Sequence, residues 1–217
     1  LADGTPIDAY KTTASAYRNR IRYGERTDGP LSVTVVLNDG SMRAERDTVA
    51  DIYRDQTADR PIDVTVREDL TVGQLARELA TPTDFLHYIG HCENGGLRCP
   101  DGTLSTAELA RSRTRTFFLN ACGSYHEGID LVEAGSMAGA VTLTAVLDEQ
   151  AATVGTTFAR LLTHGFSIER GMQIARRQVL MGKDYAVVGD GTSSLVPVPE
   201  EEAVVHLTGR DGEYEVR

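Results

Sequence analysis

The sequence predicts an α/β fold, a three-layer α/β/α sandwich around a mostly parallel sheet of about six strands. Three observations support this prediction. The chain has 217 residues, 41% hydrophobic and 25% charged, which suits one folded domain of ordinary size. Apolar runs rich in β-branched residues alternate with segments of helical periodicity. Glycine, proline or a helix-capping residue separates most of these segments, as expected for strand-to-helix crossovers.

Six apolar segments are predicted to be the strands of this sheet. The first is LSVTVVLND, residues 31–39, a β-branched run bounded by Pro30 and Gly40. The others are residues 61–69, 84–90, 114–122, 139–148 and 184–190. Because helical segments lie between them, right-handed crossovers should make most neighbours parallel and place helices on both faces.

Capping residues and glycines mark the predicted helices. Ser41 can cap a helix over residues 41–55, and Glu45 would lie in its early turns. Thr71 and Ser167 are placed to begin two further helices. The remaining predicted helices are residues 71–80, 105–112, 128–135, 151–165 and 167–182.

The ends of the chain differ from this alternating region. Residues 1–30 are polar and contain several glycines and prolines, which predicts a lead-in or linker, with room for a short helix. Residues 31–197 form the predicted domain. Residues 198–217 contain Asp211-Gly212 between short β-prone pieces, which predicts a peripheral hairpin. Since the sequence begins with Leu1, we expect a fragment or processed piece with a missing N-terminal partner domain.

Composition argues against several function classes. No stretch approaches the roughly 18 apolar residues of a membrane helix and no leader opens the chain, so we expect a cytoplasmic protein without membrane attachment. Its 32 acidic and 22 basic residues give a net charge of −10, which disfavours nucleic-acid binding. Three cysteines cannot all pair with one another, so free thiols are expected.

Two predicted strands run directly into reactive side chains. The strand 84–90 is followed by His91, and the strand 114–122 ends in Cys122. Carboxyl ends of neighbouring parallel strands lie about 5 Å apart, so an imidazole and a thiol could share one crevice. A histidine that takes the thiol proton would make Cys122 a nucleophile, and Gly123 would allow the tight turn that aims backbone N–H groups at an oxyanion. On spacing alone, a buried structural cysteine and a loop histidine are the favoured interpretation of these residues.

The order of these motifs resembles that of a known family. Residues 85–92, FLHYIGHC, resemble the HxxGH strand end of caspase-like proteins, and residues 117–124, FFLNACGS, resemble their nucleophile turn. Residues 131–176 resemble the stretch that follows the nucleophile in CHAT domains, and residues 185–190, YAVVGD, resemble their last strand. The resemblance covers residues 31–197 and implies a caspase-like fold.

The resemblance also implies roles for individual residues. His91 would be the general base and acid, Cys122 the nucleophile, and the N–H groups of Cys92 and Gly123 the oxyanion donors. It implies a cysteine endopeptidase that cleaves protein or peptide substrates without a cofactor. Such domains are often fused to sensor modules or controlled by a regulatory protein. The family usually has glycine directly after the catalytic histidine, where this chain has Cys92.

Two other interpretations remain open. The first is a catalytically degenerate CHAT-like domain that only binds other proteins. The second is a zinc site, since several histidines and cysteines are competent ligands, although their spacing on predicted strands and the absence of a C-x-x-C pair argue against it. These residues are His87, His91, Cys92, Cys99, Cys122 and His126. We expect a structural role for His87 and a solvated position for His126.

Acidic residues directly follow the apolar run of residues 139–147. Asp148 and Glu149 should emerge at the same rim as the catalytic pair, so we expect them to bind a basic residue immediately before the cleaved bond. In arginine-cleaving members of the clan a similar acidic turn contributes to recognition. Asp148 could instead cap the helix that follows.

Overall fold

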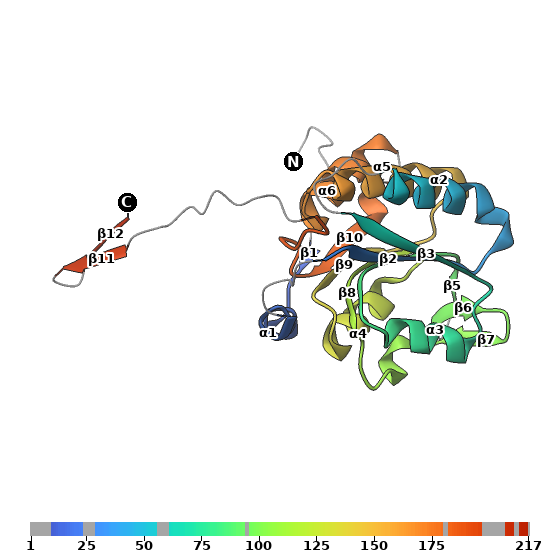
Figure 1. The fold of residues 1–217 in the computed structure, drawn as a ribbon, viewed down its shortest axis with the longest axis horizontal. Helices are drawn as coiled ribbons and strands as arrows, with labels where there is room; N and C mark the ends of the chain where they lie inside the picture. The colour runs from blue at the N-terminus through green and yellow to red at the C-terminus, as the bar shows by residue number, and fades with distance from the viewer. Residues whose placement is uncertain are drawn as a thin grey trace.

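A seven-stranded mixed sheet forms the centre of the protein (Figure 1). The computed structural model describes residues 10–23, 29–55, 61–93, 96–179, 182–196, 207–210 and 213–216. The strands are β1 (Tyr10–Lys11), β2 (Leu31–Leu37), β3 (Ile62–Glu68), β4 (Thr83–Ile89), β8 (Thr114–Asn120), β9 (Ala138–Thr142) and β10 (Tyr185–Gly189). Their order across the sheet is β1-β10-β9-β8-β4-β2-β3. The predicted α/β class and mostly parallel sheet are confirmed, since only the β9–β10 pair in this sheet is antiparallel.

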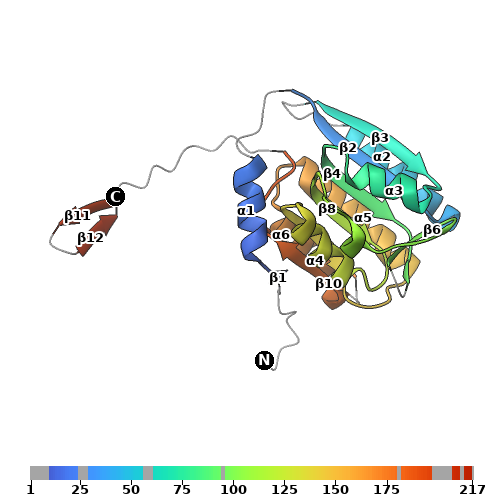
Figure 2. The same ribbon diagram turned by 90° about the horizontal axis from the view of Figure 1, so that it is seen from below.

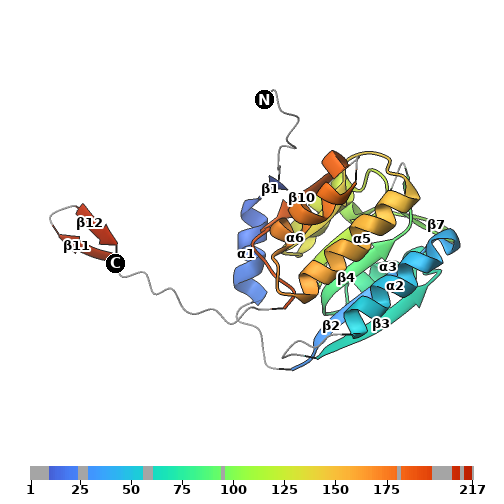
Figure 3. The ribbon, with the colours of Figure 1, turned by 90° about the horizontal axis from the view of Figure 1, so that it is seen from above.

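Helices cover both faces of the sheet, as the predicted three-layer architecture requires. On one face lie α2 (Arg43–Arg54), α5 (Asp148–Thr163) and α6 (Ile168–Ala175), which Figure 3 shows in front of the strands. On the other face lie α3 (Val72–Leu79) and α4 (Tyr125–Ala134), with α1 (Ala14–Tyr23) at the side (Figure 2). The strands are therefore buried from both sides.

Alternating side chains of the central strands build two apolar cores. Phe85 and Phe118 face α5, where their rings pack around Phe158 at centroid distances of 6.4 and 5.2 Å. Leu86 and Phe117 point to the opposite face and its own cluster. All five side chains are fully buried, and each contributes about 1.5–3 kcal/mol of burial free energy. These cores fix the strand register that positions the loops above them.

The helix starts follow the predicted capping residues with one exception. Thr71 and Gln74 form a complete capping box, and the Ser167 side chain caps α6. Ser41 does not cap the helix that was predicted over residues 41–55. Instead the Asp39 carboxylate accepts the Ser41 N–H and caps a 3-10 turn, Gly40–Met42, so that α2 begins at Arg43.

The segment predicted as one strand over residues 139–148 is shorter in the structure. It pairs with β10 from Ala138 opposite Gly189 to Thr142 opposite Tyr185, where β10 begins. One more bond follows, from the Leu143 N–H to the Asp184 carbonyl at 2.7 Å, and the chain then leaves the sheet and runs to α5. The helix predicted over residues 167–182 is also shorter, because a 3-10 turn, Arg176–Gln178, follows α6.

A small antiparallel sheet next to the main one was not predicted. It consists of β5 (Cys92–Glu93), β6 (Gly96–Cys99) and β7 (Gly102–Leu104) and directly follows β4. The segment predicted as a helix over residues 105–112 contains only a 3-10 turn, Thr106–Glu108.

The two ends of the chain also contain regular structure. In the N-terminal lead-in, β1 pairs with β10, and the buried Asn19 of α1 donates to the Val132 and Ser136 carbonyls at 2.7 and 2.8 Å. In the tail, β11 (Leu207–Arg210) and β12 (Glu213–Val216) form an antiparallel hairpin. In the part of the chain that the structure describes, every helix is too short or too polar to cross a membrane.

Candidate active site

The two strands that carry the predicted catalytic pair are neighbours. β4 and β8 run parallel, with Ile89 opposite Asn120 at their last aligned position. The Gly90 N–H donates to the Asn120 carbonyl at 3.4 Å, so the pairing extends one residue beyond β4. His91 follows Gly90, and Cys122 lies two residues after Asn120. The fold thus brings both residues to the same edge of the sheet, as predicted.

The His91 ring is held by a carboxylate that sequence reasoning missed. His91 Nε2 lies 2.7 Å from Asp39 Oδ2, with the two side chains 31% and 19% exposed. The Ser41 Oγ–H and N–H both donate to Asp39 Oδ1, at 2.6 and 2.8 Å. These bonds from Ser41, assisted by the His91 ring, hold the pKa of Asp39 below its usual value. Asp39 is therefore placed to orient His91.

A sequence signal for Asp39 was available. Asp39 follows β2, and β2 pairs in parallel with β4, Leu37 opposite Ile89. The reasoning that selected residues after the strands ending at Ile89 and Asn120 therefore applies to the end of β2 as well. The sequence does not show that β2 and β4 are neighbours, because β3 and α3 lie between them along the chain.

The Cys122 thiol is half-buried and contacts the backbone of Val146. The Val146 N–H donates to Cys122 Sγ at 3.4 Å, and the thiol donates to the Val146 carbonyl at 3.7 Å. Among the described contacts of His91 and Cys122, no hydrogen bond joins the imidazole to the sulfur. The structure places both residues at one edge but leaves each bonded to a different neighbour.

The turn after Cys122 is held by buried hydrogen bonds. Gly123 has φ of +70°, a left-handed conformation that favours glycine. Ser124 and Thr142 are fully buried, and their hydroxyls bond to the Leu119 and Ala121 carbonyls respectively. The Gly123 N–H, the predicted oxyanion donor, donates to the Thr144 carbonyl at 3.2 Å.

Cys92, the second predicted oxyanion donor, begins the small sheet. It lies opposite Leu97, between the neighbouring pairs His91–Arg98 and Glu93–Gly96. The Arg98 N–H donates to the His91 carbonyl at 2.9 Å, so the alternation of an antiparallel ladder places Cys92 at a non-hydrogen-bonded position. Its N–H points away from β6. Burial raises the pKa of the Cys92 thiol to about 11, which disfavours the thiolate at this position.

Polar side chains next to the Cys122 turn fix the end of β8. The buried Asn120 side chain donates to Glu45 of α2 at 2.7 Å and to the Ala151 carbonyl of α5 at 3.1 Å. The Tyr185 hydroxyl donates to Asn120 Oδ1 at 3.5 Å. These bonds tie the base of the Cys122 turn to both helices above it.

The other candidate ligand residues do not join the site. The His87 ring is fully buried, lies 3.3 Å from the Tyr53 hydroxyl and packs edge-on against Phe85. Burial lowers its pKa to about 3, so the imidazole is neutral. His126 lies on α4 beside Tyr125. Within the described ranges, histidines, cysteines and carboxylates form no group of three or more suited to a metal ion, and the six residues considered for zinc are all described.

The predicted acidic pair lies at the start of α5. Asp148 is the first residue of this helix, and Leu147 is the capping position, with no side-chain cap. Glu149 is exposed. Both residues follow residues 143–147, whose backbone contacts the Cys122 turn.

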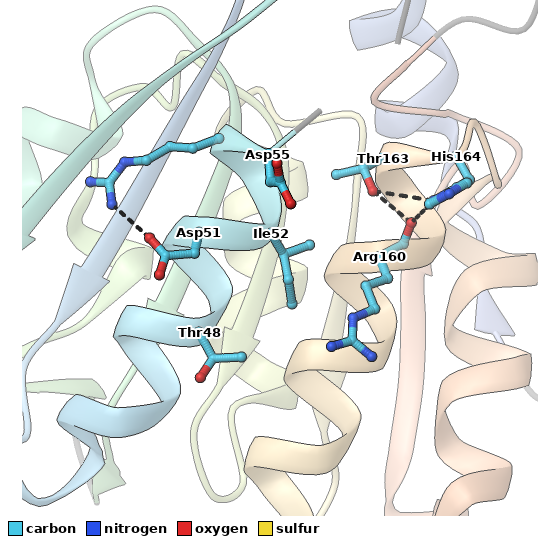
Figure 4. Close-up of a pocket in the computed structure, with 8 residues that line it drawn as sticks. Thr48, Asp51, Ile52, Asp55, Arg160, Thr163 and His164 are labelled. Carbon is cyan, nitrogen blue, oxygen red and sulfur yellow. Dashed lines mark hydrogen bonds and ion pairs between the residues drawn. The ribbon is translucent and has the colours of Figure 1, made fainter. Parts of the chain in front are cut away.

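A separate pocket lies between α2 and α5 (Figure 4). Its walls include Thr48, Asp51 and Ile52 of α2 and Arg160 and Thr163 of α5. Apart from Thr48 at the middle of α2, these residues belong to the C-terminal halves of the two helices, whereas the Cys122 turn lies near their N-termini. The pocket is therefore distinct from the candidate active site.

Solved structures with the same fold include separase and an Arg-specific cysteine proteinase. Separase of Saccharomyces cerevisiae, in complex with securin, is 12% identical with a TM-score of 0.58, over 81% of this chain and 13% of that one. The Arg-specific cysteine proteinase gingipain R is 12% identical with a TM-score of 0.63, over 83% and 52%. A complex of Porphyromonas gingivalis RgpB pro- and mature domains gives 14% identity, a TM-score of 0.60 and coverage of 82% and 52%.

These similarities establish the class of fold. The chain has the caspase-like α/β fold of separase and gingipain R, and it spans between about an eighth and a half of their lengths. No family model matches the sequence. No curated protein matches it either.

Proposed function

We propose that this chain is a cysteine endopeptidase of the CHAT type with His91 and Cys122 as its catalytic pair. The observation that carries the proposal is the pairing of β4 with β8, whose aligned ends lead into His91 and Cys122. The fold is that of two cysteine proteinases, separase and gingipain R, which supports the same chemistry. Asp39 serves as a positioning residue for His91.

The proposed reaction follows from these roles. Because Asp39 binds His91 Nε2, Nδ1 is left to accept the Cys122 proton. The thiolate attacks the scissile carbonyl carbon, and the N–H groups of Cys92 and Gly123 stabilise the oxyanion. As the carbon–nitrogen bond breaks, the imidazolium returns the proton to the leaving amine. Water then hydrolyses the thioester with His91 again as base.

The proposed substrate is a protein or peptide with a basic residue before the cleaved bond. Asp148 and Glu149, at the start of α5, would bind its side chain. The similarity to an Arg-specific proteinase supports this preference. Separase with securin and RgpB with its pro-domain are both complexes with a protein partner, which supports control of this chain by a regulatory protein or fused sensor domain.

Covalent labelling tests the proposal. An electrophilic peptide library with varied side chains before the reactive group should label Cys122 in the wild type, and arginine-containing members should react fastest. Cys122→Ala and His91→Ala should lose labelling and peptide hydrolysis with unchanged melting temperatures, because each removes one half of the acyl-transfer machinery. Cys99→Ala is the matched control and should keep both. Hydrolysis by Cys122→Ala at the wild-type rate would exclude the assignment.

A protein-binding module without activity is the second candidate. It is favoured by the contacts of the thiol and of the Gly123 N–H, which are bonded to Val146 and Thr144 rather than available to a substrate. A module of this kind would remain unlabelled by every member of the electrophile library, with and without a bound partner.

A further inference from the structure

Residues 143–147 connect β9 to α5 and contact the nucleophile turn through their backbone. The Thr144 carbonyl accepts the Gly123 N–H at 3.2 Å. The Val146 N–H donates to Cys122 Sγ at 3.4 Å, and the Val146 carbonyl accepts from the thiol at 3.7 Å. We call residues 143–147 the latch.

We propose that the latch is an autoinhibitory element that holds the site in a resting state, an inference that rests on the proposed peptidase function. An oxyanion hole needs donors about 2.7–3.1 Å from the developing charge. In the resting state the Gly123 N–H donates to the Thr144 carbonyl and is not available to an oxyanion. The thiol that donates to Val146 carries its proton, whereas the nucleophile is the thiolate. The latch thus blocks two catalytic groups with two adjacent contacts.

The latch is held lightly between two anchored ends. The Leu143 N–H donates to the Asp184 carbonyl at 2.7 Å, and the Leu147 carbonyl accepts from Ala151 at 2.8 Å. Between these points Val146 is the buried side chain, 9% exposed. The exposed residues are Leu143, Thr144, Ala145 and Leu147. Few buried contacts oppose its displacement, so it can open without unfolding the sheet below.

Displacement of the latch completes the proposed site. It frees the Gly123 N–H to act with the Cys92 N–H, which already points away from β6. It also frees the sulfur to bond to His91. The Asp39–His91 pair needs no change, because Asp39 lies after β2, apart from the latch.

The first test measures the alkylation rate of Cys122 by iodoacetamide in the whole chain, with peptide mapping. Val146→Ser removes the buried anchor and keeps the backbone, so Cys122 should react at least about fivefold faster than in the wild type. Leu143→Ser makes a similar change at an exposed side chain, 46% exposed, and should stay within about twofold of the wild type. Equal rates in Val146→Ser and the wild type, with the fold retained by circular dichroism, would overturn the proposal.

The second test uses the wild type. It is needed if Val146→Ser loosens the whole fold, which faster alkylation of the buried Cys99 would reveal. Alkylation of Cys122 should displace the latch, so hydrogen exchange at the Gly123 and Val146 amides should accelerate while the helical Gly128 amide stays protected. Unchanged exchange at Gly123 after alkylation refutes the latch. If Val146→Ser is alkylated faster than the wild type but neither protein hydrolyses any peptide before alkylation, the result supports the latch and counts against the peptidase function.

Discussion

Replacing Asp39 by Asn tests the carboxylate that orients His91. Asn retains the shape of the side chain, and it caps helical turns as well as Asp, so the 3-10 turn at Ser41 should persist. What changes is the partner of His91 Nε2, which loses a charged acceptor at 2.7 Å. An imidazolium formed during catalysis would then lack its counter-charge.

The magnitude follows from the geometry of this bond. A hydrogen bond to a charged group contributes about 1.5–3 kcal/mol. Because the His91 and Asp39 side chains are 31% and 19% exposed, solvent screening favours the lower end of this range. A loss of about 1.5–2 kcal/mol corresponds to a decrease in kcat/KM of about 10- to 30-fold. Stability should change little, since Ser41 keeps its acceptor in the variant.

The assay compares Asp39→Asn with the wild type in peptide hydrolysis and in labelling of Cys122 by an electrophilic peptide. Asp51→Asn is the matched control, because it makes the same change on the exposed face of α2, where among the described residues Asp51 pairs with Arg54 at 3.2 Å. The control should retain wild-type rates. Turnover of Asp39→Asn within about twofold of the wild type would refute the orienting role, because the expected loss of about 1.5–2 kcal/mol requires a decrease of at least about tenfold.

Two further predictions concern stability. His87 has a pKa of about 3 in the fold against 6.5 in the unfolded chain, so the unfolded state binds the extra proton between these values. The free energy of unfolding should therefore fall as pH drops below about 6.5, by up to about 1.4 kcal/mol per pH unit. In urea titrations at several pH values, His87→Gln should show a smaller dependence on pH. An equal dependence in both proteins would contradict the burial argument. Gly139→Ala would place a Cβ 2.1 Å from the Phe117 ring and should lower the free energy of unfolding by about 1–3 kcal/mol. Gly73→Ala, at an open helical position, should raise it by up to about 1 kcal/mol. An unchanged free energy of unfolding in Gly139→Ala would mean that the Phe117 ring can move.

The sequence was sufficient for the fold because burial on both faces leaves a clear pattern. Strands such as β2 and β8 are continuous apolar runs, and Thr71 and Ser167 start their helices as their side chains predict. The pattern could not show the antiparallel direction of β10, since hydrophobicity carries no information on strand direction. The short strands β5 to β7 were missed because pieces of two to four residues have too little periodicity.

The candidate site was predictable where it depends on adjacent strand ends. His91 and Cys122 follow from that rule, while Asp39 was missed because the order of strands in the sheet differs from their order in the chain. The latch was hidden for a different reason. Residues 143–147 have the β-prone composition of a strand, but the paired strand β10 begins opposite Thr142, and after the Leu143–Asp184 bond they leave the sheet. The end of β9 is therefore set by where β10 begins, which the sequence of residues 143–147 does not show.

The two halves of the site differ in how firmly they are held. The His91 carbonyl accepts from the Arg98 N–H at 2.9 Å and from the Tyr88 hydroxyl at 3.2 Å, while Asp39 holds its ring. Among the described residues the non-glycine with positive φ is Asp69, so Cys92 has an ordinary extended backbone. A side chain at this position, where the resembled family usually has glycine, therefore causes no backbone strain. The small sheet that starts at Cys92 therefore strengthens the histidine side. The cysteine side has a rigid turn covered by a lightly held latch. If the proposed roles hold, control of this site is most easily exerted at the latch, because its displacement would change the proposed nucleophile, Cys122, and one proposed oxyanion donor together and leave His91 in place.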